Sequence, residues 1–277
     1  RDGGDRLENL EKMINAVEET QKRGLNRAEH RLHLRCELPH HTTLPLFEKL
    51  VGREPVTLVS LMDHSPGQRQ FANIEKYREY YQGKYSLTND EMARYEEEQL
   101  ALAARWSQPN RLSIAAMCRD RNIALASHDD ATHEHVAESH QLGSVIAEFP
   151  TTFDAAEASR RHGMNVLMGA PNIVRGGSHS GNVAASKLAS LGLLDILSSD
   201  YYPASLLDAA FRVADDESNT FTLSQAIRLV TKNPADALHL QDRGVIGEGK
   251  RADLVLAHRK GEHIHIDHVW RQGKRVF

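Results

Sequence analysis

The chain has little cysteine and no long apolar run, and each shortage excludes a class of protein. Its two cysteines, Cys36 and Cys118, lie far apart in a sequence of 277 residues. So little cysteine excludes a disulfide-stapled secreted fold and favours a reducing compartment, so we expect a cytoplasmic protein. No apolar stretch approaches the roughly 20 residues of a membrane-spanning helix, so we expect no membrane partner.

The chain also lacks a large excess of positive or negative charge. The formal net charge is −4, and no long basic or acidic run stands out. A nucleic-acid partner requires a strongly basic surface, so none is indicated. Hydrophobic residues make up 40% of the chain, which is enough for one large domain or two medium ones. A homo-oligomer is compatible with this composition.

Six short apolar segments alternate with segments of helical character. The former have the length and composition of buried strands, and the latter carry apolar residues at helical spacing. The segments expected to be strands are 30–39, 55–67, 123–130, 144–150, 164–172 and 193–203. The segments expected to be helices are 5–24, 74–104, 111–122, 131–143, 152–163, 180–192, 205–216 and 222–240. This alternation predicts an α/β fold with a parallel sheet covered by helices.

The spacing of polar residues at the predicted strand ends narrows the fold. Glu37 and His64 are 27 positions apart, and Asn172 and Asp200 are 28 apart. A (β/α)8 barrel averages about 31 residues per unit, so these intervals fit. Only six units are visible, which leaves an open doubly wound sheet or a barrel that lacks two strands at its start. Because the chain begins abruptly, without a methionine, we favour the barrel with missing strands.

The last part of the chain differs in composition and in its hydrophobic pattern. Glycines 244, 247 and 249 interrupt it, and three short strand-like segments follow, at 252–257, 263–270 and 275–277. We expect a small β-rich appendage, so that residues 1–238 form the barrel domain and residues 239–277 a second unit. The HIHIDH segment alternates along its strand, and we expect its histidines on an exposed face.

Polar side chains stand where four of the predicted strands end. They are Glu37, His64, His128 and Asp200. Because the carboxyl ends of parallel strands meet at one mouth, we expect these side chains to converge. Imidazoles with carboxylates suit a borderline divalent cation such as Zn²⁺ or Mn²⁺, as one ion or two. Such a cation lowers the pKa of bound water, and Asp200 is the carboxylate expected to accept the proton.

Other interpretations of these acidic residues stay open. Asp200 could instead cap the following helix or brace a turn. Asp129 and Asp130, directly after His128, are expected to cap the next helix, with Asp130 at its N-cap. Glu148 ends another strand and could equally pair with an arginine.

A glycine-rich segment supplies donors for an anion. Gly176 and Gly177 allow backbone conformations in which consecutive N–H groups converge, and a predicted helix follows. Further donors suited to phosphate oxygens are Arg175, Ser178, His179 and, after another strand end, Arg69. A glycine-rich loop is often only a turn, so the phosphate site is one of two interpretations.

Several motifs together resemble the amidohydrolase superfamily. The segment TKNPADALHLQDRGVIGEGKRADLVLA is similar to the signature at which that family leaves its barrel for a small β-sandwich. Five further segments resemble the branch of this family that degrades phosphonates. They are RLHLRCELPHH, SLMDHSPGQRQF, LASHDDAT, GAPNIVRGGSHSGNVAA and LSSDYYPASLL. The resemblance implies a TIM-type (β/α)8 barrel with about six of its eight strands present and a remnant of the sandwich at the C-terminus. The family's first two strands have no counterpart, so we expect a truncated chain.

The resemblance also implies a function. This is metal-dependent hydrolysis of a ribose 5-triphosphate that bears methylphosphonate at C1, with release of pyrophosphate, for the carbon–phosphorus lyase pathway. Glu37, His64 and His128 would hold metal. Asp200 would be a further ligand and the base, and segment 175–182 would bind the triphosphate. The alternatives are a ring amidohydrolase, since metal ligands alone do not distinguish C–N from P–O cleavage, and a non-catalytic phosphosugar-binding fragment.

Overall fold

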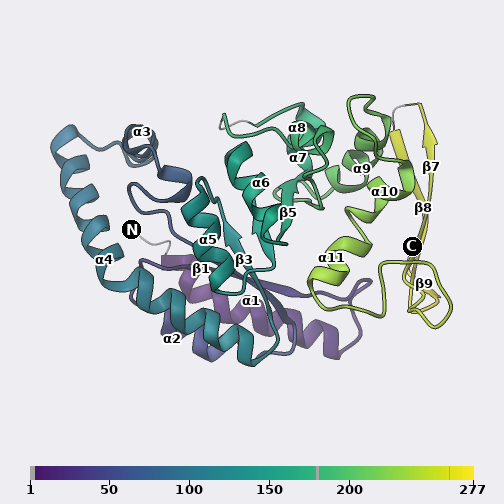
Figure 1. Ribbon diagram of the computed structural model, residues 1–277. Coiled ribbons are helices and arrows are strands. Elements are labelled where there is room, and N and C mark those ends of the chain that lie inside the picture. Colours follow the sequence, from purple (N-terminus) through teal and green to yellow (C-terminus); the bar gives the residue numbers. More distant parts are fainter. Residues whose placement is uncertain (1–3, 179–180, 262) are drawn as a thin grey trace.

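The computed structural model describes residues 4–178, 181–261 and 263–277. Its centre is a parallel sheet whose strand order follows the chain without a reversal (Figure 1). The strands are β1 (Leu32–Glu37), β2 (Val56–Met62), β3 (Ala124–His128), β4 (Ile146–Glu148), β5 (Asn165–Gly169) and β6 (Ile196–Ser198). A doubly wound sheet reverses its strand order at a switch point, so the consecutive order matches a barrel arrangement. The α/β class and the six predicted strands are confirmed.

The inner strands are buried on both faces, whereas the outer strand β1 carries polar residues on one face. All five residues of β3 and all three of β4 are buried. Near-continuous apolar runs are typical of parallel sheets, since helices cover both faces. Ala126 and Ile146 pack with Leu167 and Ile196 in one cluster, so neighbouring strands share a single core. Within the described residues, the outer strands β1 and β6 do not pair with each other.

Helices follow the strands, and several begin at threonine caps. Thr132 and Thr152 each accept a hydrogen bond from the backbone N–H three residues later, which satisfies a helix-end donor. These helices are α1 (Gly4–Lys22), α2 (Thr43–Leu50), α5 (His133–Gln141), α6 (Phe153–Arg161), α7 (Ala170–Arg175), α8 (Ala185–Ser190), α9 (Ser205–Asp215), α10 (Leu223–Arg228) and α11 (Lys232–Ala237). In the described ranges no helix combines the length and the apolar character that crossing a membrane requires.

The segment between β2 and β3 is divided differently from the sequence prediction. A short 3-10 turn (Arg69–Phe71) is followed by α3 (Ile74–Tyr85) and the long α4 (Asn89–Asp120). The two helices are separated at Ser86, whose left-handed φ of 54° ends α3. The sequence pattern placed the break between residues 104 and 111, and that prediction is wrong.

Tertiary contacts explain why α4 continues through that region. Pro109 lies inside the helix and removes one helical hydrogen bond. The next residue, Asn110, donates its side-chain N–H groups to the backbone carbonyls of Leu38 (2.8 Å) and His40 (3.0 Å). Ile114 is buried in the cluster that covers β1 and β2. These contacts hold the second half of the helix in line, and they come from residues far away in the sequence.

Two further boundaries differ from the prediction. β5 ends at Gly169, so Asn172 lies in α7 and not at a strand end. Pro171 falls in the first turn of α7, where its missing N–H leaves no helical bond unmade. The helix predicted at 222–240 is two short helices, α10 and α11.

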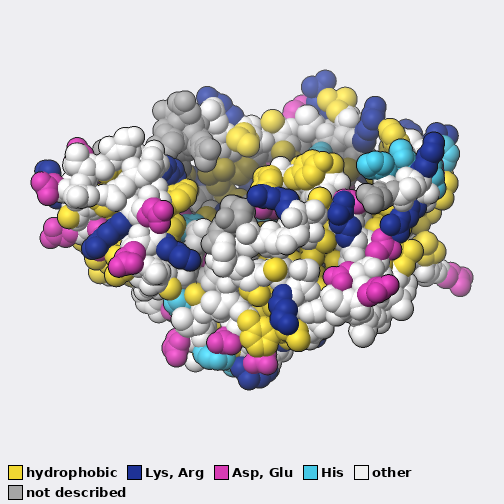
Figure 2. All heavy atoms as spheres, turned by 90° about the horizontal axis from the view of Figure 1, so that it is seen from above, with side chains coloured by type: hydrophobic (Ala, Val, Ile, Leu, Met, Phe, Trp, Pro, Cys, Tyr) yellow, Lys and Arg dark blue, Asp and Glu magenta, His cyan; other side chains and the backbone are white. Residues whose placement is uncertain are grey.

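An antiparallel sheet forms the end of the chain. It contains β7 (Leu254–Lys260), β8 (His263–Arg271) and β9 (Lys274–Arg275), and lies at the opposite end of the molecule from α3 and α4 (Figure 1). The predicted β-rich appendage is confirmed, while the domain boundary at residue 238 stays a prediction. His263 and His265 are exposed as expected, whereas His268 is half-buried; Figure 2 shows histidine side chains at this end of the molecule.

One carboxylate ties the segment before β1 to the segment before β7. Glu29 pairs with Arg31, Arg243 and Arg251, and its carboxylate lies 3.1 Å from Arg243 Nη1. Burial opposes ionisation of this group, but the hydrogen bonds from Arg251 and Arg243 lower the pKa of Glu29 to about 2. The contact therefore joins residues more than 200 positions apart through a carboxylate that is charged near neutral pH.

Replacing Glu29 with glutamine is expected to lower the melting temperature at pH 7. Solvent screens part of the contact, so we expect a loss of about 1 kcal/mol. A lowered pKa stabilises the fold above the unfolded value of 4.5, and this contribution is lost as the pH falls towards about 2. Melting curves between pH 7 and pH 2.5 should show the difference shrinking below pH 4.5. Glu157→Gln, which breaks an exposed pair with Arg161, is the matched control, and an equal effect of both changes would contradict the prediction.

Candidate metal centre and anion site

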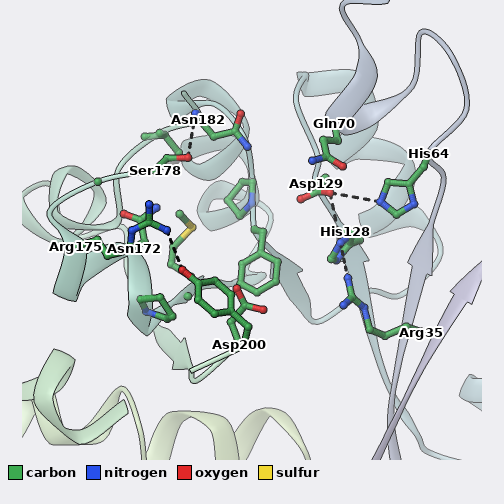
Figure 3. Close-up of a pocket in the computed structure, with 18 residues that line it drawn as sticks. Arg35, His64, Gln70, His128, Asp129, Asn172, Arg175, Ser178, Asn182 and Asp200 are labelled. Carbon is green, nitrogen blue, oxygen red and sulfur yellow. Dashed lines mark hydrogen bonds and ion pairs between the residues drawn. The ribbon is translucent and has the colours of Figure 1, made fainter. Parts of the chain in front are cut away.

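A cavity of about 280 Å³ opens at the carboxyl ends of the parallel strands. Its walls come from residues that follow β2, β3, β4, β5 and β6 (Figure 3). The predicted site residues that line it are His64, His128, Arg175, Gly177, Ser178 and Asp200. Polar lining residues that the sequence analysis did not select include Arg35, Gln70 and Asp129, and Asn182 ends the segment 175–182 that was expected to bind the triphosphate. The polar strand ends thus converge on one mouth, as expected for parallel strands.

His128 ends β3 and is held by a carboxylate on the neighbouring strand. Its Nδ1 lies 2.8 Å from Glu148 Oε2, and the register places His128 directly beside Glu148. The same carboxylate oxygen accepts a hydrogen bond of 2.6 Å from the hydroxyl of Ser60 on β2. Burial disfavours the charge of Glu148, but the hydrogen bond from His128 and the other partners lower its pKa to about 2. Glu148 is therefore a charged acceptor for a histidine and not the partner of an arginine.

The hydrogen-bond partners of His128 define its tautomer. A carboxylate only accepts and a guanidinium only donates. Nδ1 faces the Glu148 carboxylate, and Nε2 lies 2.9 Å from Arg35 Nη2. With an acceptor at Nδ1 and a donor at Nε2, the two contacts fit the tautomer that carries its proton on Nδ1 and its lone pair on Nε2.

His64 follows β2 and is held in the same way by Glu37. Its Nδ1 lies 2.6 Å from Glu37 Oε2, and its backbone N–H donates to Glu37 Oε1 at 3.1 Å. Burial lowers the pKa of His64, but hydrogen bonds to Asp129 and Glu37 outweigh it and raise the pKa to about 10. Metal ligation by Glu37 stays a prediction. In this structure the Glu37 carboxylate contacts Nδ1 of His64, on the side of the ring away from the cavity, and does not line the cavity.

Asp129 is the site residue that the sequence analysis misassigned. It was expected to cap the next helix, together with Asp130 at the N-cap, but the N-cap of α5 is Thr132. Asp129 instead has a left-handed φ of 56°, which turns its carboxylate into the cavity beside the two histidines. Asp130 is buried and pairs with Arg69. The signal was present in the SHDD segment, where two acids follow a strand-end histidine.

The geometry of His64, His128 and Asp129 fits a divalent cation. One ligand atom from each lies within 4.8 Å of the others. Nδ1 of each ring faces a carboxylate, so Nε2 is turned towards Asp129 Oδ2, at 3.8 Å from His64 and 3.4 Å from His128. Carboxylate partners on the far nitrogen are typical of metal-binding histidines, because they fix the ring orientation. Two imidazoles and one carboxylate leave further coordination positions for water or substrate.

Asp200 lies across the cavity from this cluster (Figure 3). It follows β6, is exposed and has a left-handed φ of 48°. Its side chain packs beside Gly169, where an added Cβ would lie 3.7 Å from Asp200 Oδ2. Asp200 is not part of the three-residue cluster, so the structure brings it to the same cavity but not to the same group of candidate ligands.

The glycine-rich segment contributes to the opposite wall. Arg175 ends α7 and donates from Nη1 to the hydroxyl of Tyr201 at 3.0 Å. Gly176, with a φ of 81°, caps α7 and does not line the cavity, whereas Gly177 and Ser178 do. The predicted donor His179 lies outside the described residues. The helix expected to follow directly begins only at Ala185.

Arg69 is in the structure but not at the cavity. Only 3% of its surface is exposed, and its guanidinium pairs with Asp130 and, at 3.0 Å, with Glu138. Burial and the nearby Arg111 lower the pKa of Arg69 to about 10. Its neighbour Gln70 lines the cavity instead. Substrate binding by Arg69 stays a prediction, because the structure gives its charge buried acidic partners.

Comparison with known proteins identifies the family. The profile of the amidohydrolase family matches residues 111–277. The chain belongs to the amidohydrolase family. Over its whole length it is 90% identical to the alpha-D-ribose 1-methylphosphonate 5-triphosphate diphosphatase of Escherichia coli strain K12, and it covers 73% of that protein. This amidohydrolase therefore has a close relative whose name states an activity on a phosphorylated ribose.

Solved structures are more distant in sequence. A D-hydantoinase is 12% identical, with a TM-score of 0.48 over 99% of this chain and 74% of that one. An adenosine deaminase from Xanthomonas campestris with bound zinc is 17% identical, with a TM-score of 0.47 over 83% of this chain and 54% of that one. A prolidase complexed with N-methylphosphonate-L-proline is 20% identical, with a TM-score of 0.45 over 60% of this chain. The amidohydrolase chain spans about half (48%) of that prolidase.

Proposed function

We propose that the chain hydrolyses alpha-D-ribose 1-methylphosphonate 5-triphosphate to the 5-phosphate and pyrophosphate, in phosphonate degradation. The observation that carries the proposal is a single cavity with a candidate metal cluster on one wall and an arginine-bearing segment on the other. The 90% identity to a diphosphatase with this substrate supports it. A triphosphate needs both features. Water must attack the phosphorus nearest the ribose, so that the bridging P–O bond breaks and pyrophosphate leaves, while the negative charge is held.

His64, His128 and Asp129 would hold the cation, with Glu37 and Glu148 fixing the two rings. The donor set suits Zn²⁺ or Mn²⁺, and we propose one ion at this cluster, with a second ion as the alternative. A bound cation supplies water with a pKa lowered towards about 7. Asp200 faces the same cavity and would accept a proton from the water molecule that attacks phosphorus.

The wall opposite the cluster would bind the triphosphate. Arg175 presents a guanidinium fork and Ser178 a hydroxyl to this wall, whereas the N–H of Gly177 donates to the backbone carbonyl of Asn172 at 2.9 Å. The fork matches phosphate oxygens, whereas a neutral ring amide offers it no charge to bind. The segment therefore favours the phosphorylated sugar over the substrate of a ring amidohydrolase.

Phosphorus NMR of the purified protein with the ribose triphosphate tests the proposal. We expect pyrophosphate to form, to stop forming when a chelator removes the cation, and to form again when Zn²⁺ or Mn²⁺ is restored. Release of orthophosphate, or no reaction with the cation bound, would contradict the proposal.

Arg175→Ala is expected to raise KM for the triphosphate with a smaller change in kcat. Loss of a bidentate charged contact to phosphate costs about 1.5–3 kcal/mol, which corresponds to roughly a 10- to 150-fold rise in KM. Initial rates measured against substrate concentration check this. Tyr201→Phe is the matched control, because it removes the hydroxyl that Arg175 contacts but keeps the guanidinium. An unchanged KM in Arg175→Ala would remove this segment from the site.

A further inference from the structure

Strand β1 turns one face towards the candidate site, and two residues on that face contact the two histidines. Glu37 contacts Nδ1 of His64, the nitrogen on the far side of the ring from the cluster. Arg35 differs, because its Nη2 lies 2.9 Å from Nε2 of His128, the nitrogen turned towards Asp129 (Figure 3). Glu37 therefore supports a candidate ligand, whereas Arg35 occupies the ligand atom itself.

Only one partner can use the Nε2 lone pair of His128. The ring proton is on Nδ1, where Glu148 accepts it, so Nε2 carries a single in-plane lone pair. That lone pair either accepts a hydrogen bond from Arg35 or binds a cation. A cation held by His128 therefore displaces the guanidinium, and repulsion between two positive charges acts in the same direction.

The displaced guanidinium has room and one suitable kind of partner. Arg35 is exposed, sits on the outer strand of the sheet and lines the cavity. Arg175 lines the same cavity from the other side (Figure 3). Asp129, whose carboxylate lies 3.4 Å from Nε2 of His128, would be engaged by the cation. Asp200 is the other carboxylate that lines the cavity, and it lies across from the cluster. An anion bound between the two arginines is a suitable acceptor, because phosphate oxygens match the guanidinium fork.

We propose that Arg35 is a phosphate-binding residue that becomes available only when a cation binds His128. The cation takes the Nε2 lone pair, and the released guanidinium binds phosphate oxygens from the side opposite Arg175. This inference rests on the proposed function and adds a coupling to it. Cation binding and phosphate binding strengthen each other through Arg35, and by linkage each raises the affinity for the other by the same factor.

Isothermal titration of the purified protein with Mn²⁺ and with inorganic phosphate tests the coupling without turnover. In the parent protein, saturating Mn²⁺ should raise phosphate affinity at least about fivefold. In Arg35→Gln, Mn²⁺ should bind several-fold more tightly, because the competing guanidinium is gone, and the enhancement of phosphate affinity by Mn²⁺ should fall at least by half. Arg161→Gln makes the same change of charge on the exposed side of α6 and should match the parent in both titrations.

The possible outcomes separate this inference from the proposed function. If the parent binds Mn²⁺ and phosphate and Arg35→Gln behaves identically, the role of Arg35 is overturned while the hydrolase site stands. If the parent binds no Mn²⁺, both are overturned. Should Arg35→Gln not fold, as judged by circular dichroism, Arg35→Lys replaces it. Lysine keeps the charge but lacks the fork, so Arg35→Lys should still reduce the enhancement of phosphate affinity, and an unchanged enhancement would overturn the proposal.

Discussion

His128→Ala is expected to reduce the rate of pyrophosphate release by more than about 100-fold. Changing a residue that only hydrogen-bonds a metal ligand typically costs up to about 100-fold, and loss of a ligand itself should cost more. The reason is that His128 supplies one of the two imidazole nitrogens of the candidate metal cluster. Metal content should fall together with the rate, because the remaining histidine and carboxylate form an incomplete ligand set. The measurements are initial rates by phosphorus NMR and bound metal by elemental analysis.

His133→Ala is the matched control for this change. His133 lies five residues further on, at the start of α5, and is exposed. It should keep both the parent rate and the parent metal content. His128→Ala also leaves the buried Glu148 carboxylate without its histidine, so a thermal melt should confirm that the variant is folded at the assay temperature. A folded His128→Ala protein with normal rate and metal content would show that the cluster is not the reaction centre.

Asp200→Asn is expected to lower kcat by about 10²- to 10⁴-fold, the range for loss of a positioned general base. An amide cannot accept a proton from water at neutral pH, although it keeps the size of the carboxylate. Because Asp200 lies outside the three-residue cluster, the affinity for Mn²⁺ should change little. Measuring kcat and the Mn²⁺ dissociation constant on the same preparations therefore distinguishes a base from a ligand.

Asp154→Asn is the control for this second change. Asp154 is exposed in the first turn of α6, so the same replacement there should alter neither quantity. A parallel loss of Mn²⁺ affinity and kcat in Asp200→Asn would show that Asp200 is a metal ligand, as the sequence resemblance implies. A normal kcat would exclude Asp200 as the base.

The positions of His64 and His128 could be predicted from the sequence because they depend on local pattern. Each follows a short apolar run, and such runs form the buried strands of a parallel sheet. Parallel strands end on one side of the sheet, so residues at their carboxyl ends meet whatever their separation in the chain. The convergence of these two histidines with Asp200 on one cavity follows from that rule, whereas Arg175 is placed by helix α7.

The division of labour among the acidic residues could not be predicted in the same way. Asp129 and Asp130 are adjacent and chemically identical, yet one faces the cavity and the other pairs with Arg69. The difference arises from the left-handed backbone of Asp129 and from a buried arginine supplied by a segment 60 positions earlier. No local pattern distinguishes the two carboxylates, because what separates them is a backbone angle and a distant partner.

The sequence by itself determined the strand–helix alternation, the six parallel strands, the antiparallel appendage and the two histidines at strand ends. These features rest on hydrophobic periodicity and composition, which act within a few residues along the chain. Only the tertiary structure decided which nitrogen of each histidine faces the cavity, that Asp129 completes the cluster, and that Arg35 contacts His128. These depend on the register of neighbouring strands and on single hydrogen bonds between residues as much as 93 positions apart, and such contacts exist only once the sheet has formed.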